Sequence, residues 1–92
     1  METIRTIIKP IIDLPATGNQ IKTLRRANGL SVRDLQDVFC FDYPQAIYAW
    51  EQGRNVPTVD NLLVLARLFN CTIDEIVKYR DVESQVMCSK SA

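Results

Sequence analysis

Histidine is absent from this 92-residue chain, and glycine and cysteine occur only three times each. Without histidine, the chain lacks the most frequent general base and the most frequent metal ligand of proteins. Cys40, Cys71 and Cys88 are odd in number and widely spaced, which argues against a disulfide framework or a zinc site. We expect Cys40 and Cys71 to be small buried residues and Cys88 to be an exposed thiol. The sequence also lacks a phosphate-binding glycine loop and a nucleophile motif. We therefore expect no enzyme, no catalytic residue, no metal, no cofactor and no small-molecule substrate.

Net charge and long apolar runs are missing as well. Eleven basic residues balance eleven acidic ones, so any basic surface must be local. No apolar run approaches the roughly 20 residues that span a bilayer. The first residues lack the apolar stretch and cleavage site of a secretory signal. We expect one small cytoplasmic domain that does not bind membranes, and an apolar fraction of 47 % excludes a disordered chain.

Polar residues spaced three apart mark five expected helix starts. In each pair the first side chain caps a free backbone N–H of the first turn, and the second reaches back to the cap. The pairs are Thr17 with Gln20, Ser31 with Asp34, Asp42 with Gln45, Thr58 with Asn61, and Thr72 with Glu75. Apolar residues at helical spacing follow each pair, with Leu35 and Val38 expected to be buried after the second and Ile47 and Trp50 after the third. The pattern predicts five helices between residues 17 and 80, beginning near residues 18, 32, 43, 59 and 73.

The two ends of the chain differ from this helical region. Residues 1–16 carry five isoleucines interrupted by Pro10 and Pro15, which predicts an extended apolar arm. Such an arm either lies across the domain or pairs as a strand with a second subunit. Residues 81–92 predict a flexible, frayed C-terminal tail. The expected organisation is thus an arm at 1–16, a helical domain at 17–80 and a tail at 81–92.

A set of residues recurs at a characteristic spacing through the predicted helices. The set is Ile21, Leu24, Arg25, Gly29, Leu30, Ser31, Leu35, Ile47, Trp50, Glu51, Gly53, Pro57, Leu62, Leu65, Ala66, Asp74, Glu75 and Ile76. On these residues the chain resembles the DNA-binding domain of the lambda repressor and Cro type, the XRE family. The resemblance implies an all-α, five-helix lambda-repressor-like fold with a helix-turn-helix, and a structural ion pair between Arg25 and Glu51. Three departures affect the docking geometry: Cys40 replaces the glycine of the turn, the turn is one residue longer, and Val32 replaces a phosphate-contacting glutamine.

The resemblance further implies that the third helix enters the major groove of DNA by its N-terminal end. The base-reading candidates are Pro44, Gln45, Tyr48 and Ala49. The amide of Gln45 suits adenine N6 and N7, and the methyl of Ala49 suits a thymine methyl. Two alternatives stay open, because Gln45 also fits the role of capping partner to Asp42, and Tyr48 also fits a half-buried aromatic or a protein interface.

Phosphate contacts are expected on either side of the third helix. The candidates are Ser31, Arg33, Tyr43, Arg54 and Asn55, whose hydroxyl, guanidinium and amide groups donate to phosphate oxygens. Lys22 and Arg26 are also basic, with a solvated helix face as the alternative for both.

The leading functional interpretation is a sequence-specific, DNA-binding transcriptional regulator that acts as a repressor. It is expected to bind double-stranded DNA as a homodimer, with half-sites about 34 Å apart. The alternative is a protein-interaction module of the same fold, such as an antitoxin or a partner of another regulator. Zero net charge, two tyrosines near the groove face and the missing glutamine favour this alternative.

Overall fold

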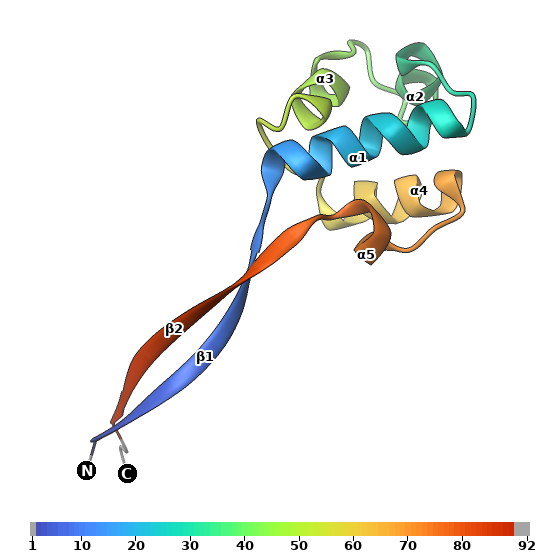
Figure 1. Ribbon diagram of the computed structural model, residues 1–92. Helices are drawn as coiled ribbons and strands as arrows, with labels where there is room; N and C mark the ends of the chain where they lie inside the picture. Colours follow the sequence, from blue (N-terminus) through green and yellow to red (C-terminus); the bar gives the residue numbers. More distant parts are fainter. Residues whose placement is uncertain (1, 90–92) are drawn as a thin grey trace.

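The structure, a computed structural model, describes residues 2–89 and the side chains of residues 4–86. The elements are β1 (Glu2–Ile12), α1 (Leu14–Ala27), α2 (Val32–Val38), α3 (Gln45–Glu51), α4 (Val59–Phe69), α5 (Ile73–Ile76) and β2 (Tyr79–Ser89). Helix α1 runs between the pair α2–α3 and the pair α4–α5 (Figure 1). The two strands form a ribbon that projects from this helical domain, so the molecule measures 57 × 23 × 22 Å. The five predicted helices are present, but the ribbon means that the fold is not purely all-α.

The core lies inside the helical domain and draws on all five helices. Apolar residues at helical spacing turn toward one centre because burying them removes apolar surface from water. The buried hydrophobic residues are Ile21, Leu35, Ile47, Trp50, Leu62, Leu65, Ala66, Phe69 and Ile76. Val38 was expected to join them, but it is 45 % exposed at the end of α2.

Three of the expected helix caps form. At α2, the Ser31 hydroxyl accepts from the Asp34 amide (3.0 Å), and the Asp34 carboxylate accepts from the Ser31 amide (2.8 Å). Thr58 caps α4 and Thr72 caps α5 by accepting an N–H bond from the third residue of the helix, but among the described residues the side chains of Asn61 and Glu75 make no return bond to the cap. These caps satisfy backbone donors that the helices leave unpaired.

The cap expected for the first helix is wrong. Helix α1 begins at Leu14, three residues before Thr17, and Asp13 is its cap, accepting from the Ala16 amide (3.1 Å). Pro15 occupies the first turn, where its missing N–H costs little. Thr17 is buried one turn into the helix.

The cap expected for the third helix is also wrong. Helix α3 begins at Gln45 with Pro44 at the cap position, and no side-chain hydrogen bond closes it. Asp42 therefore caps nothing here; instead its backbone carbonyl accepts from the Gln36 side chain (3.1 Å).

Four helices end in a left-handed residue. Gly29 (φ 68°), Cys40 (φ 55°), Gly53 (φ 74°) and Asn70 (φ 53°) follow α1, α2, α3 and α4. In each case a paired 5→2 and 6→1 hydrogen-bond pattern satisfies the last carbonyls; after α2, Cys40 N donates to Asp37 O (3.2 Å) and Phe41 N to Gln36 O (3.0 Å). Glycine enters this conformation without a Cβ clash, whereas Cys40 does not.

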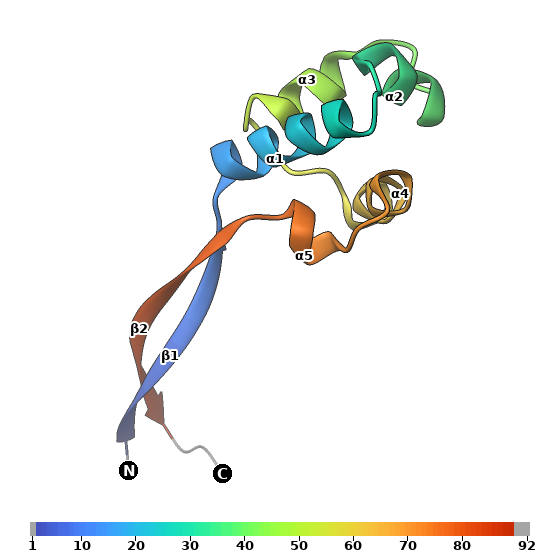
Figure 2. The same cartoon turned by 45° about the vertical axis from the view of Figure 1, so that its right-hand side comes forward.

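The N-terminal arm and the C-terminal tail pair with each other. β1 and β2 are antiparallel, with a register that runs from Glu2 opposite Ser89 to Ile12 opposite Tyr79. The expectation of a frayed tail from residue 81 is wrong, because the strand β2 extends to Ser89. The part of the tail beyond residue 89 lies outside the described residues. In both views the free end of the ribbon and the α2–α3 pair lie at opposite ends of the molecule (Figures 1 and 2).

The base of the ribbon is fixed to α1. The carbonyl of Lys78 accepts from the Asp13 amide (2.8 Å) and from the Thr17 hydroxyl (3.2 Å). The Thr17 hydroxyl accepts in turn from the Lys78 amide (2.9 Å). Because Thr17 is buried, these bonds are shielded from water and tie both strands to the first turn of α1.

Candidate nucleic-acid interface

An ion pair fixes α3 against α1. The Arg25 guanidinium donates to both carboxylate oxygens of Glu51, from Nε at 2.7 Å and from Nη2 at 3.2 Å. Its Nη1 also donates to the carbonyl of Leu30 (2.9 Å). Both side chains are over 90 % buried, at 9 % and 7 % exposed. The pair implied by the family resemblance is thus present, and its bidentate geometry sets the angle of α3.

The close approach of α1 and α3 depends on Gly18. A Cβ built at this position would lie 2.5 Å from the Trp50 carbonyl oxygen and 2.7 Å from the Glu51 carbonyl oxygen. These are backbone atoms, which cannot move aside as a flexible side chain could. Gly18 therefore lets α1 run directly against the last turn of α3.

Three aromatic rings brace the turn between α2 and α3. Phe39 and Phe41 stack with ring centroids 5.2 Å apart, and Trp50 meets their edges at 5.4 and 5.9 Å. Such offset and edge-on pairs are the favourable aromatic geometries. Phe41 was not predicted to be a packing residue; its place directly after the left-handed Cys40 is the signal that indicates this role.

Helix α3 buries one side and exposes the other. Ile47 and Trp50 point into the core, as expected from their spacing. Gln45 is exposed at the first position of the helix, and within the described residues its side chain makes no hydrogen bond. Because no Asp42 cap forms, the capping alternative for Gln45 does not apply.

The other base-reading candidates lie around this exposed side. Tyr48 is 44 % exposed one turn after Gln45, while Pro44 and Ala49 are half-buried. Tyr43 is 71 % exposed in the turn before the helix. The structure thus brings a glutamine and two tyrosine side chains to the N-terminal end of α3.

The phosphate candidates flank α3 on two loops. Ser31 and Arg33 lie at the start of α2, and Arg54 and Asn55 follow α3; all four are exposed. Arg33 makes a loose i,i+4 pair with Asp37 (3.6 Å), in which both side chains are more than 70 % exposed. Exposed pairs of this kind contribute about 0–1 kcal/mol, so a phosphate can displace Asp37 at small cost.

Acidic groups lie among these basic ones. Asp34, Asp37 and Asp42 are exposed on α2 and in the turn after it. Hydrogen bonds from the Ser31 amide and hydroxyl hold the pKa of Asp34 below its ordinary value, so this carboxylate is charged at neutral pH. The surface around α2 and α3 therefore carries both signs of charge rather than a continuous basic patch.

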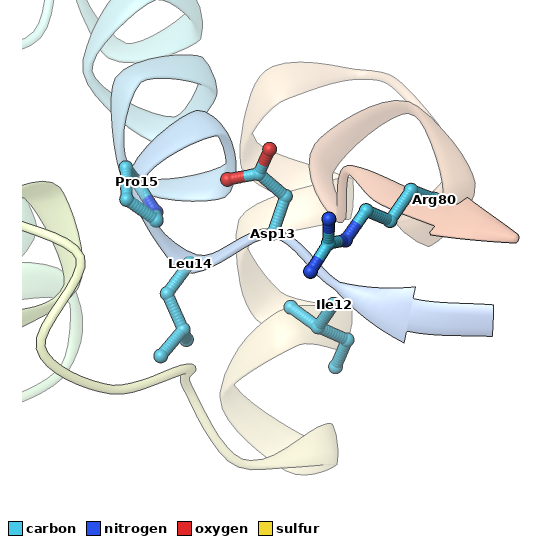
Figure 3. A pocket seen from close by; sticks show the side chains of 5 residues that line it. All are labelled: Ile12, Asp13, Leu14, Pro15 and Arg80. Atoms are coloured by element: carbon cyan, nitrogen blue, oxygen red, sulfur yellow. The ribbon is translucent and has the colours of Figure 1, made fainter. Parts of the chain in front are cut away.

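Two open cavities of the described part of the chain lie elsewhere, where the ribbon joins the helices. One, of about 390 Å³, is lined by Ile12, Asp13, Leu14, Pro15 and Arg80 (Figure 3). The second, of about 510 Å³, is lined by Pro10, Ile12, Asp74, Tyr79 and Asp81. In the same described part, no helix is long and apolar enough to cross a membrane.

Comparison with known proteins assigns the arrangement to a family. The helix-turn-helix family model matches residues 21–76, from the first core residue of α1 to the end of α5. The chain belongs to the XRE helix-turn-helix family. No curated protein matches its sequence.

Two solved structures are similar to this helix-turn-helix chain. They are the BldD DNA-binding domain of S. venezulae and a crystal structure of the DNA-binding domain of BldD. Each has 20 % identity and a TM-score of 0.59; the match covers 71 % of this chain and 96 % and 93 % of the two domains. At this identity the likeness shows the fold. The family and the fold are those of DNA-binding regulators.

Proposed function

We propose that this helix-turn-helix protein is a sequence-specific transcriptional repressor that binds double-stranded DNA as a homodimer, with α3 in the major groove. The observation that carries the proposal is the N-terminal end of α3. It exposes Gln45 and Tyr48 on a helix whose other side is fixed by the core and by the Arg25–Glu51 pair. A cytoplasmic location follows from this function.

Gln45 is the main base-reading residue of the proposal. Its amide both donates and accepts, which suits the N6 and N7 atoms of adenine in the major groove. Ala49 lies one turn later and is small enough to let the helix approach the bases, while Pro44 and Tyr48 border the contact. A rigid α3 matters here because a misplaced amide loses its paired hydrogen bonds.

Phosphate contacts fix the position of α3 along the duplex. Arg33 and Ser31 would hold the backbone on the α2 side, and Arg54 and Asn55 on the other side, with Tyr43 donating its phenolic hydroxyl. Each phosphate that a basic residue neutralises makes the slope of log K against log salt concentration more negative by about one unit.

The experiment is selection of random duplexes by the purified full chain, followed by binding titrations of the enriched sequence. We expect an inverted repeat whose half-sites lie about 34 Å apart. Gln45→Ala is expected to lose about 1–3 kcal/mol, roughly 5- to 150-fold in affinity, and to relax specificity at one position.

Gln52→Ala is the matched control, since Gln52 is an exposed glutamine at the opposite end of α3. It should stay within about threefold of the parent, because only the N-terminal end of the helix enters the groove. Equal losses for the two variants would contradict the proposed docking. For the phosphate contacts, Arg33→Ala and Arg54→Ala should weaken all duplexes alike and lower the salt slope. A reporter whose promoter overlaps the selected site then tests repression.

The mixed charge of the α2–α3 surface favours a second candidate, a protein-interaction module of the same fold. Asp34, Asp37 and Asp42 repel phosphate, and the exposed rings of Tyr43 and Tyr48 suit a protein interface. Weak, unselective DNA binding that disappears at higher salt would support this candidate over the repressor.

A further inference from the structure

The two faces of the ribbon differ in charge. Side chains alternate across a strand, and residues opposite each other in the register share a face. One face, here called the isoleucine face, carries Ile4, Thr6, Ile8, Pro10 and Ile12 from β1, with Tyr79, Asp81, Glu83 and Gln85 from β2. The other, the basic face, carries Arg5, Ile7, Lys9 and Ile11 from β1, with Arg80, Val82, Ser84 and Val86 from β2.

The isoleucine face is uncovered. Ile4 is 64 % exposed and Ile8 is 65 % exposed, while Ile12 and Tyr79 at the base are 46 % and 53 % exposed. On the basic face, Ile7 is half-buried. Ile11, at the base of the basic face, is 43 % exposed, so the most exposed isoleucines of the ribbon, Ile4 and Ile8, both lie on the isoleucine face. An isolated two-stranded ribbon is marginally stable in water, so the isoleucine face needs a cover.

A hollow continues the isoleucine face into the helical domain. Pro10, Ile12, Tyr79 and Asp81 of the face, with Asp74 of α5, line the cavity of about 510 Å³. An apolar row that ends in a concave site offers a partner both a flat contact and a place for a projecting side chain.

We propose that the isoleucine face is the homodimer interface, and that a second copy of this chain covers it with its own isoleucine face. The two ribbons run in the same direction and are offset sideways, so that the β1 strands lie over each other and the two β2 strands lie on opposite sides, about a two-fold axis that runs along the ribbon between the β1 strands. The inference deepens the proposed function, on which it rests, by naming the surface that joins the two DNA-binding domains.

The charge pattern selects this arrangement. The β1 row of the isoleucine face is uncharged from Ile4 to Ile12, so two such rows can meet directly. In the same-direction arrangement, the acidic Asp81 and Glu83 of the two copies fall on opposite rims, where water solvates them. Basic face on basic face would oppose like charges, and isoleucine face on basic face would build an open chain rather than a closed dimer.

The direction of the ribbons also suits DNA. The ribbon and the α2–α3 pair lie at opposite ends of the molecule (Figures 1 and 2). A two-fold axis along the ribbons therefore brings both helical domains to one end, with both α3 helices turned away from the ribbons. Two half-sites of an inverted repeat require this arrangement of recognition helices.

The size of the contact predicts a dimer of modest affinity. In this arrangement only the β1 rows meet, and one strand of eleven residues, at about 3.3 Å per residue and 4.8 Å wide, presents a footprint of roughly 170 Å² per copy. Two footprints fall below the roughly 1,200 Å² of a stable standard interface. We expect dissociation in the micromolar range without DNA.

Sedimentation equilibrium of the full chain, without DNA and between about 1 and 500 μM, tests the interface. The diagnostic variant is Ile8→Lys, which places a charge on the isoleucine face directly opposite Glu83. The matched control is Ile11→Glu, which places a charge on the basic face opposite Arg80. Each new charge faces an opposite one across the ribbon, so each variant keeps a favourable cross-strand pair.

The expected result is a parent dimer, an unchanged Ile11→Glu variant, and a dissociation constant raised at least 100-fold in Ile8→Lys. Ile8→Thr, which keeps a β-branched residue, should give a smaller loss in the same direction. A parent that stays monomeric to 500 μM would overturn the proposal and assign the face to a different protein. Equal dissociation constants for parent and Ile8→Lys would also overturn it, because the copies would then join elsewhere, for example along the edge of β2.

Small-angle X-ray scattering of the dimer tests the direction of the ribbons. A same-direction dimer keeps a long axis near the 57 Å of one copy and gains cross-section, because the second copy adds width. Opposed ribbons would place the helical domains at the two ends and lengthen the particle by most of a domain, which would overturn the proposed geometry.

Failure of the interface is distinguishable from failure of the DNA-binding proposal. Ile8→Lys leaves α3 intact, so it should bind a single half-site as the parent does and lose only the gain from the second half-site. A parent protein that does not bind the half-site would contradict the DNA-binding proposal. The dimer measurement, which is made without DNA, would be unaffected.

Discussion

Cys40→Gly is expected to stabilise the protein, because Cys40 occupies the left-handed position that ends α2. Its φ is 55°, a conformation that costs a non-glycine residue about 1–2 kcal/mol. The expectation that Cys40 is buried is wrong: its side chain is exposed, so removing it sacrifices little packing. Against the gain stands the greater freedom of glycine in the unfolded chain, about 0.4–1 kcal/mol. The difference is a net stabilisation of roughly 0.5–1 kcal/mol, which raises the Tm of a small domain by roughly 2–8 °C.

The assay is thermal unfolding followed by circular dichroism under reducing conditions, with Cys40→Ala as the matched control. Alanine removes the thiol but keeps the Cβ, so it should retain the backbone strain and unfold near the parent temperature. The hydrogen bonds of the turn, Cys40 N to Asp37 O and Phe41 N to Gln36 O, are backbone bonds that all three proteins can form. A Cys40→Gly protein that melts no higher than Cys40→Ala would refute the reasoning, since the strain at this position would then be negligible.

Three further expectations concern the parts that hold α3 and α2. Glu51→Ala should destabilise the protein by about 3–5 kcal/mol in urea unfolding, because it leaves the buried Arg25 guanidinium without its counter-charge; Glu51→Ala unfolding like an exposed surface substitution would contradict this. Gly18→Ala should lower stability by about 1–3 kcal/mol, because the new methyl meets backbone oxygens of α3 closer than 3 Å, and an unchanged Tm would refute the close approach. Hydrogen bonds from Ser31 lower the folded-state pKa of Asp34 below 3.8. The ionised Asp34 carboxylate therefore stabilises the fold above about pH 3.8, and this stabilisation is lost as the pH falls through the lowered pKa. Asp34→Asn should flatten that acidic part of the curve of stability against pH, and an unaltered curve would argue against the cap.

The helical domain was predictable because its signals are local. Ser31, Thr58 and Thr72 cap helices by hydrogen bonds that span three residues, and a pattern of three residues is visible in any sequence. Core positions such as Ile47 and Trp50 follow from the helical period in the same way. The predicted caps failed where a proline was present: Pro44 at the cap of α3, and Pro15 in the first turn of an α1 that starts early.

The ribbon was not predictable as a ribbon because its pairing is non-local. Ile12 and Tyr79 lie far apart in the sequence, and their pairing depends on the intervening helices, which place Lys78 against Thr17. Nothing in residues 81–89 alone indicates which strand they pair with. The isoleucines of the arm are compatible with a strand that packs on any apolar surface, so they do not specify β2 as the partner. The candidate base-reading residues came from the family resemblance, and the duplex selection is what tests them.

Helix α1 links the two proposed interfaces. Its first turn is tied to the ribbon through Asp13 and Thr17, and its later turns are tied to α3 through Gly18 and Arg25. In the proposed dimer, the ribbons set the distance between the two copies of α1, and each α1 sets the position of its α3. The spacing of the two recognition helices therefore depends on contacts at both ends of one helix. A change at the ribbon base should accordingly shift the preferred half-site spacing while leaving the sequence of each half-site unchanged.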